Sequence, residues 1–364
     1  MTVSAPVRLG LLRLADSAPS VVALQRGLFR ELGLSVELSV EPSWANIADK
    51  LAYGLLDAAS MLPPLALAAA LGLRGAPAKL LVPMGLSGGG NTVTVRREVA
   101  DAIASPAGAH DALAKGRRLA AWLRAQPAPP RFAVVHAFST HNLLLRYWLA
   151  ASGIDPDRDI TTVVIPPEQV QAALAEGRIA GFCAGAPWGE LAEQDGTGRH
   201  LLGTSEIWAN HPEKCLAVAE PWAMANPAAL QALLRGLLQA QLLCEQAGSA
   251  AWVAGLLAEP PLNLPAAAVR ACLPRGSAAE RIRFHAGGAW VPQRSQAIWF
   301  LAQMRRWGWL GTEIDLRDAA ERVYRPDLLA ATADAEGRSW PGTDIVTAGG
   351  LCDGTIGDQP AAGG

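Results

Sequence analysis

The sequence lacks an excess of either charge and lacks a segment suited to a membrane. Its 364 residues include 31 basic and 33 acidic side chains, which leaves a net charge of -2. Proteins that bind nucleic acid or anionic lipid directly usually present a basic surface, so direct contact with either is not expected. No basic stretch followed by a long apolar run opens the chain, and the alanine-rich residues 65–73 are too few to span a bilayer. We expect a cytoplasmic protein without a membrane span.

Cysteine is also scarce. The chain has five cysteines, an odd number, and no two of them show the Cys-x-x-Cys spacing. A disulfide framework needs paired cysteines and a structural zinc site commonly needs closely spaced ones, so the pattern argues against both and fits a reducing compartment. We expect no metal and no cofactor. The chain also has no Gly-x-Ser-x-Gly turn to support a nucleophile, so no catalytic activity is predicted.

The sequence does contain a repeated alternation of strand and helix. Residues 7–12, 34–40 and 55–62 have the apolar character of buried strands, with helical segments between them. A second series begins at residues 132–136 and continues through 161–165. Strands that alternate with helices predict parallel sheets, and 364 residues exceed one ordinary core. We therefore predict an α/β protein with two lobes, each a mostly parallel sheet flanked by helices.

The two lobes are expected to be joined by two crossings of the chain. Residues 1–96 and 215–341 are assigned to the first lobe, and residues 97–214 to the second. Residues 342–364 are rich in glycine and polar side chains, and we expect them to form a flexible tail. Ligands bind at the carboxyl ends of parallel strands, so the predicted site lies at that edge of the sheets, in the cleft between the lobes.

Three polar stretches are predicted to lie at this edge. Thr140 and His141 fall where a strand feeds a helix, so backbone N–H groups and the positive end of the helix dipole face the cleft. Gly90 ends a run of three glycines before Asn91, and such a turn can expose N–H groups to an anion. Lys214 follows a turn and begins a strand that returns to the first lobe. The alternative interpretation is a capped helix with a surface histidine and a solvated surface lysine.

Several motifs resemble those of the nitrate- and bicarbonate-binding receptors of bacterial ABC transporters. The motifs are Thr140-His141-Asn142, Val164-Ile165-Pro166-Pro167, Phe182-Cys183-Ala184-Gly185-Ala186-Pro187-Trp188 and His211-Pro212-Glu213-Lys214. The similarity extends over most of the chain. It implies a two-lobed type II periplasmic-binding-protein fold that closes on one small oxyanion.

The resemblance also implies which residues contact the anion. The family's anion-binding histidine falls on His141, its lysine on Lys214, and a tryptophan of the first lobe on Trp44. The family's glutamine after an Asn-Gly pair falls on Asn91, whose shorter amide can still donate a hydrogen bond. Together with Gly90, these residues form the predicted ligand-binding set.

Two departures from the family pattern bear on the ligand. The aspartate that follows the family's histidine is Asn142 in this chain, and the glutamate before Pro-Trp is Ala186. Both changes remove negative charge, which fits poorly with a calcium-assisted bicarbonate site built from carboxylates. We therefore expect a metal-free site for a monoanion, nitrate or nitrite.

A cytoplasmic member of this family resembles the nitrate/nitrite sensors of assimilation operons. In those systems a receptor-like protein holds an RNA-binding antiterminator inactive until the anion releases it. We predict this role, with nitrate or nitrite as the ligand and an antiterminator of the ANTAR type as the protein partner. The alternative is a substrate-binding receptor of a nitrate/bicarbonate-type ABC transporter. A third possibility, an enzyme like the thiamin-pyrimidine synthases, is disfavoured because the five cysteines are dispersed.

Overall fold

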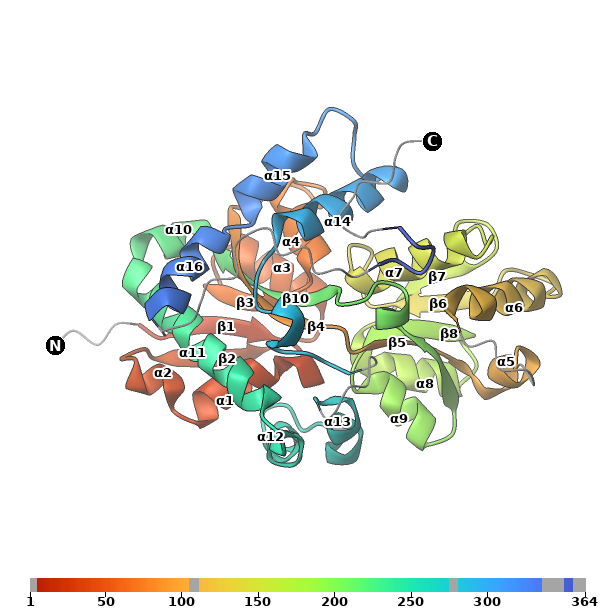
Figure 1. Ribbon diagram of the computed structural model, residues 1–364, viewed down its shortest axis with the longest axis horizontal. Coiled ribbons are helices and arrows are strands. Elements are labelled where there is room, and N and C mark those ends of the chain that lie inside the picture. Colours follow the sequence, from red (N-terminus) through yellow and green to blue (C-terminus); the bar gives the residue numbers. More distant parts are fainter. Residues whose placement is uncertain (1–4, 105–110, 275–280, 336–349, 356–364) are drawn as a thin grey trace.

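The structure is a computed structural model that describes residues 5–104, 111–274, 281–335 and 350–355. It has two lobes that lie side by side, each built around one five-stranded sheet with helices on its faces (Figure 1). The predicted α/β class and the two-lobed arrangement are therefore confirmed. Among the helices of the described ranges, none is long and apolar enough to cross a bilayer.

The sheet of the first lobe has the strand order β2-β1-β3-β10-β4. Its strands are β1 (Val7–Leu11), β2 (Val36–Val40), β3 (Ala58–Met61), β4 (Leu80–Gly88) and β10 (Pro212–Ala219). Strand β1 pairs in parallel with β2 and β3, whereas β10 is antiparallel to both β3 and β4. Every residue of β3 and β4 is buried, which explains why both read as continuous runs rather than as an alternating pattern.

The sheet of the second lobe repeats this plan with the order β7-β6-β8-β5-β9. Its strands are β5 (Asn91–Arg96), β6 (Arg131–Val134), β7 (Thr161–Val164), β8 (Gly181–Gly185) and β9 (Gly198–Gly203). Strand β5 is antiparallel to β8 and β9, and β6 is parallel to β7 and β8. In each sheet, four strands run in one direction and one strand runs opposite to them. The opposing strand is β10 in the first sheet and β5 in the second, and each follows a crossing of the chain between the lobes.

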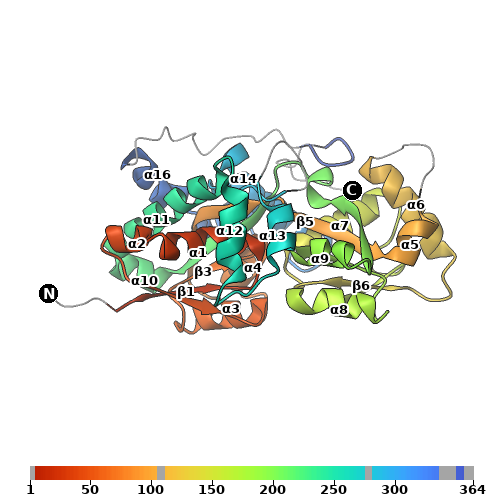
Figure 2. The same ribbon diagram turned by 90° about the horizontal axis from the view of Figure 1, so that it is seen from below.

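The helices cover the faces of both sheets and link the lobes. In the first half of the chain they are η1 (Ala15–Ser17), α1 (Ala18–Gln25), α2 (Leu28–Glu31), α3 (Trp44–Ala52), α4 (Pro63–Ala70), α5 (Arg97–Ala102), α6 (Ala112–Arg124), α7 (Thr140–Ala151), η2 (Pro167–Gln169) and α8 (Val170–Ala175). They continue as α9 (Trp188–Gln194), η3 (Thr204–Glu206), α10 (Glu220–Ala225), α11 (Pro227–Glu245), α12 (Ser249–Ala258), α13 (Ala266–Cys272), η4 (Ala286–Gly288), α14 (Arg294–Arg306), α15 (Leu316–Val323) and α16 (Pro326–Ala335). Helix α13 packs against α9 of the second lobe (Figure 2). Helix α14 packs against both α4 and α7, so α13 and α14 tie the lobes together.

The positions at which the chain changes sheets differ from the prediction. Strand β5 lies in the second sheet, although residues 91–96 were assigned to the first lobe, and β10 joins the first sheet from Pro212 onward. The first crossing therefore falls at Gly89 and Gly90, whose φ angles are +66° and +81°. The alternation of strands and helices along a sequence does not show which sheet a crossing strand enters, because the strand is apolar in either place.

The predicted flexible tail is wrong for one short segment. Of residues 342–364, the parts 342–349 and 356–364 lie outside the described residues, but 350–355 pack on the second lobe beside α7 (Figure 1). Leu351 is buried and forms a β-bridge with Trp208, and the Tyr147 hydroxyl donates to Asp353 Oδ2 at 2.6 Å. This segment contacts the second lobe because its one large apolar side chain finds a buried place there.

Candidate functional site

Lys214 lies at the centre of a buried polar cluster between the two lobes. Its side chain is fully buried, and its Nζ is 2.8 Å from Asp16 Oδ2 and 2.7 Å from Glu213 Oε1. The ammonium also lies 5.3 Å from the centre of the Trp44 ring. The first lobe supplies all four residues, from η1, the start of α3 and the start of β10. A charge can remain in such a place only because two carboxylates surround it.

The second lobe adds two side chains to the same cluster. His141 Nε2 lies 3.3 Å from Glu213 Oε1, and the Asn91 amide donates to Glu213 Oε2 at 2.5 Å. His141 is in the first turn of α7, which Ser139 caps by accepting a hydrogen bond from the Asn142 N–H at 3.0 Å. The predicted helix start is thus confirmed. Asp16, Trp44, Asn91, His141, Glu213 and Lys214 are called the Lys214 cluster below.

The lobes also meet through contacts around the cluster. The Ala15 N–H donates to the Ala186 carbonyl at 2.9 Å, which links η1 of the first lobe with the end of β8 in the second. A Cβ added to Gly185 would lie 3.4 Å from Asn91 Oδ1 and 3.6 Å from His141 Nε2. Gly185 therefore packs directly beside Asn91 and His141.

Several buried donors in and beside the cluster have no hydrogen-bond partner within the described part of the chain. They are Trp44 Nε1, the Thr140 hydroxyl and the single N–H of the neutral His141 ring, neither of whose nitrogens has a partner there. Two buried acceptors of the cluster, Asp16 Oδ1 and Asn91 Oδ1, are also unpaired among the described residues. Lys214 has three N–H donors and directs two of them at Asp16 and Glu213, so the third remains. Leaving a buried donor unsatisfied costs about 1–3 kcal/mol, so such a concentration is unusual for a structural core. It is the arrangement that a small anion with several acceptor oxygens would satisfy.

Burial sets the protonation of the cluster. Burial raises the pKa of Glu213 to about 7, and the attraction of Lys214 only partly opposes this shift. Burial also lowers the pKa of His141 well below its usual value, and the nearby Lys214 lowers it further. For Lys214 itself, the two carboxylates outweigh the effect of burial, so its pKa is raised and the side chain stays charged at neutral pH.

The structure brings four of the six predicted site residues together: Asn91, His141 and Lys214 each contact Glu213, and Trp44 lies beside Lys214. Thr140 is buried at the start of α7, next to His141 in sequence. Gly90 lies at the crossing between β4 and β5, where its positive φ and the close packing of Ile282 account for the absence of a side chain. The contact of Gly90 and Thr140 with an anion stays a prediction.

Two carboxylates of the site were missed, and one predicted donor has another role. Asp16 and Glu213 were not predicted as site residues. Asn142 and Ala186 had suggested a site with less negative charge than in the family, whereas the structure places two carboxylates in it. The signal available was that Glu213 precedes a lysine inside a strand that is otherwise apolar, a place where an acid needs a cationic partner. The Asn91 amide was expected to donate to the anion, but one of its N–H groups donates to Glu213 and fixes that carboxylate.

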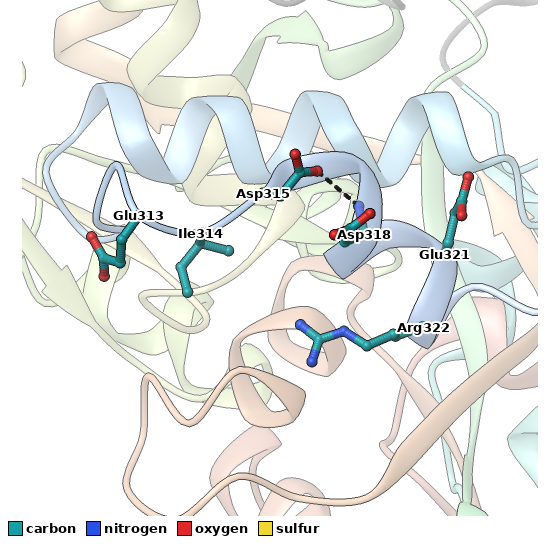
Figure 3. Close-up of a pocket in the computed structure, with 6 residues that line it drawn as sticks. All are labelled: Glu313, Ile314, Asp315, Asp318, Glu321 and Arg322. Carbon is teal, nitrogen blue, oxygen red and sulfur yellow. Dashed lines mark hydrogen bonds between the residues drawn. The ribbon is translucent and has the colours of Figure 1, made fainter.

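Other polar features of the described residues are less suited to an anion. A surface pocket of about 600 Å³ along α15 is acidic, and Figure 3 shows its carboxylates around a single arginine. It is lined by Glu313, Ile314, Asp315, Asp318, Glu321 and Arg322. On the second lobe, Glu190, Glu193 and His200 place one ligand atom each within 4.8 Å of one another, the one group of metal-binding type among the described residues. These three half-buried side chains come from α9 and β9 and do not belong to the Lys214 cluster.

The family to which this fold and site belong is shown by comparison with known proteins. Residues 3–258 match the NMT1-like family. The chain belongs to the NMT1-like family. This NMT1-like protein is 32% identical over 353 residues to the nitrate/nitrite binding protein NrtA of Synechococcus elongatus, a match that covers 91% of this chain and 78% of that one. It is also 34% identical over 351 residues to the nitrate import ATP-binding protein NrtC of Synechocystis, covering 92% of this chain and 50% of NrtC.

The chain thus spans about half the length of NrtC and most of NrtA. Among solved structures, the periplasmic nitrate-binding protein NrtA from Synechocystis superposes with a TM-score of 0.86 at 26% identity, covering 96% of this chain and 94% of that one. The alkanesulfonate-binding protein SsuA from Xanthomonas axonopodis pv. citri, at 19% identity and a TM-score of 0.64, shares the fold; the match covers 88% of this chain and 99% of that one. The NMT1-like protein therefore has the two-lobed fold of the periplasmic binding proteins.

Proposed function

We propose that this protein binds nitrate or nitrite in the Lys214 cluster, as a substrate-binding receptor whose lobes close on the anion. The observation that carries the proposal is the convergence of unpaired buried donors from both lobes on one ammonium group. The similarity to NrtA, at 32% identity, supports the same ligand class.

The donor set suits a planar, singly charged anion. Nitrate has three equivalent acceptor oxygens, and burying it requires a compensating charge and several directed donors. Lys214 supplies the charge, while the Trp44 indole and the His141 ring supply directed donors from opposite lobes. The anion therefore gains its full set of contacts only when the lobes are together, so binding favours the closed form.

The cluster also explains how the site can work without a metal. The Lys214 ammonium lies between Asp16 and Glu213, 2.8 and 2.7 Å from their oxygens, in the position where two carboxylates would otherwise attract a cation. A lysine side chain is a fixed part of the chain, so its charge does not depend on ion concentration. We infer that anion binding is independent of calcium.

Replacing Trp44 by phenylalanine tests the site. Trp44→Phe keeps the aromatic ring beside Lys214 but removes the indole N–H, so nitrate affinity should fall about tenfold, the equivalent of one hydrogen bond to a charged group. Trp122→Phe on α6 makes the same change away from the cluster and should leave affinity unchanged. Both affinities are measured by titration calorimetry. Equal affinity of Trp44→Phe and the wild type would remove Trp44 from the site.

The cellular role is a separate proposal. A cytoplasmic sensor would transmit the same closure to an RNA-binding antiterminator of the ANTAR type, as the resemblance in the sequence implies. Co-purification of such a partner in the absence of nitrate, and its release on adding nitrate, supports the sensor role. Retention of the protein by the membrane subunits of a transporter supports the receptor role instead.

A further inference from the structure

We propose that the His141–Glu213 pair takes up one proton when the site binds its anion above neutral pH. The pair would then act as a neutral or proton-sharing unit that donates to the ligand, and Glu213 would be a binding-site residue. This inference rests on the proposed function of the site. It concerns the charge of the cluster, which the identity of the ligand alone does not determine.

The net charge of the Lys214 cluster favours the uptake of a proton when an anion binds. The cluster holds one ammonium, Lys214, and two carboxyl groups, Asp16 and Glu213. If both carboxyl groups are ionised, the buried cluster is already negative by one charge, and an added monoanion would make it negative by two. Buried charge of one sign is strongly unfavourable, because the surroundings screen it poorly. One added proton restores the balance that the cluster had before the anion entered.

The geometry of the His141–Glu213 pair also favours proton uptake. His141 Nε2 lies 3.3 Å from Glu213 Oε1, and both ring nitrogens are buried without a hydrogen-bond partner in the described ranges. A neutral ring that points N–H at Glu213 presents a lone pair at Nδ1, which repels an anion. A proton added to the pair turns both ring nitrogens into donors, or makes Glu213 a donor. In either form, a group that repelled the anion now binds it.

Four titratable groups near Glu213 keep their charge near neutral pH: Lys214, Cys183, Cys215 and His211. Lys214 has a raised pKa and stays protonated, and burial raises the pKa of the Cys183 and Cys215 thiols. Burial lowers the pKa of His211, which faces Glu213 Oε2 at 3.9 Å, to about 3, so this ring stays neutral. Asp16 Oδ2 lies 2.8 Å from Lys214 Nζ. Glu213, with its pKa near 7, and His141 remain as the groups able to accept the proton.

The experiment counts protons during binding. Nitrate is titrated into the protein at about pH 8 in two buffers of different ionisation enthalpy, and the difference in observed heat gives the number of protons taken up. We expect close to one proton for each nitrate, and an affinity that falls tenfold for each pH unit between about pH 7.5 and 9. Nitrate is the anion of a strong acid and brings no proton itself, so the proton must come from the buffer.

Two variants assign the proton to the pair. Glu213→Gln keeps a side chain of the same shape without a titratable group. Its nitrate affinity should not change with pH, and its observed heat of binding should be the same in both buffers. Glu176→Gln is the matched control, because Glu176 is an exposed residue that pairs with Arg178 on the surface, and it should show the wild-type uptake. Uptake of one proton by Glu213→Gln would overturn the assignment. Wild-type binding with no proton uptake would overturn the inference, while no nitrate binding at any pH would overturn the proposed function instead.

Discussion

Replacing Lys214 by methionine should destabilise the protein as well as abolish anion binding. Methionine fills much of the same volume but leaves Asp16 and Glu213 buried without the ammonium that lies 2.8 and 2.7 Å from them. Removing one partner of a buried ion pair typically costs about 3–5 kcal/mol. Here two carboxylates lose the same cation, so the upper part of that range is expected at neutral pH.

The loss should depend on pH, with a sign that follows from Glu213. Its pKa is about 7 in the folded wild type against an ordinary value of 4.5, and it must rise further when the cation that lowers it is removed. Between these values the folded state binds more protons than the unfolded state, so stability falls as pH rises, by about 1.4 kcal/mol for each pH unit. Lys214→Met should therefore lie closest to the wild type at mildly acidic pH.

Urea unfolding at about pH 6 and pH 8 measures both effects. Lys50→Met is the matched control, because Lys50 also forms a 2.7 Å ion pair, with Glu41, but its side chain is 37% exposed. Glu41 is buried, but water reaches the Lys50 ammonium and the Ser39 hydroxyl still donates to Glu41, so this variant should lose less stability than Lys214→Met. If Lys214→Met costs no more than Lys50→Met and shows no added pH dependence, the description of a buried ion cluster is wrong.

Three further predictions concern acid stability, the chain crossing and the docked segment. Stability should fall as pH drops from about 6.5 to 4. Three histidines are neutral in the folded protein and take up protons on unfolding, and their effect outweighs the opposite effect of Glu213. Chemical unfolding across this pH range measures the loss, and a rise in stability would contradict the prediction. The three are His136, with a pKa of about 4, His211, with a pKa of about 3, and His141, whose pKa is lowered well below its usual value. Gly90→Ala should lose about 1–3 kcal/mol more than Gly54→Ala in urea unfolding, because both glycines have positive φ but only the Cβ at Gly90 would overlap Ile282; equal losses would show that the contact is unimportant. Tyr147→Phe removes hydrogen bonds to the 350–355 segment, so amide exchange there should become about fivefold faster, and unchanged exchange would contradict the docking.

Local signals in the sequence were sufficient to predict many of the elements. Strands β1 (Val7–Leu11), β2 (Val36–Val40) and β7 (Thr161–Val164) lie within the predicted ranges, because each is an apolar run between helical segments. The start of α7 was predicted at Thr140 and His141, where a strand feeds a helix, and Ser139 caps it by accepting a hydrogen bond from the Asn142 N–H. These features depend on residues that are neighbours in the chain.

Features that depend on distant residues were predicted less well. The assignment of β5 to the wrong lobe arose because only its pairing with β8 and β9 identifies its sheet. Asp16 was missed because its partner, Lys214, is almost 200 residues away, and a lone aspartate near a helix start usually faces water. The histidine, lysine and tryptophan of the site came from the family resemblance, and composition alone would not have selected them.

The central claim is that the Lys214 cluster binds nitrate or nitrite without a metal. The most direct test is calorimetric titration of the purified protein with nitrate, nitrite and bicarbonate, each in the presence of a chelator and in the presence of calcium. The account predicts that nitrate or nitrite binds with the same affinity in both conditions, and that Lys214→Met abolishes this binding. Bicarbonate binding that requires calcium, with no binding of nitrate or nitrite, would contradict it.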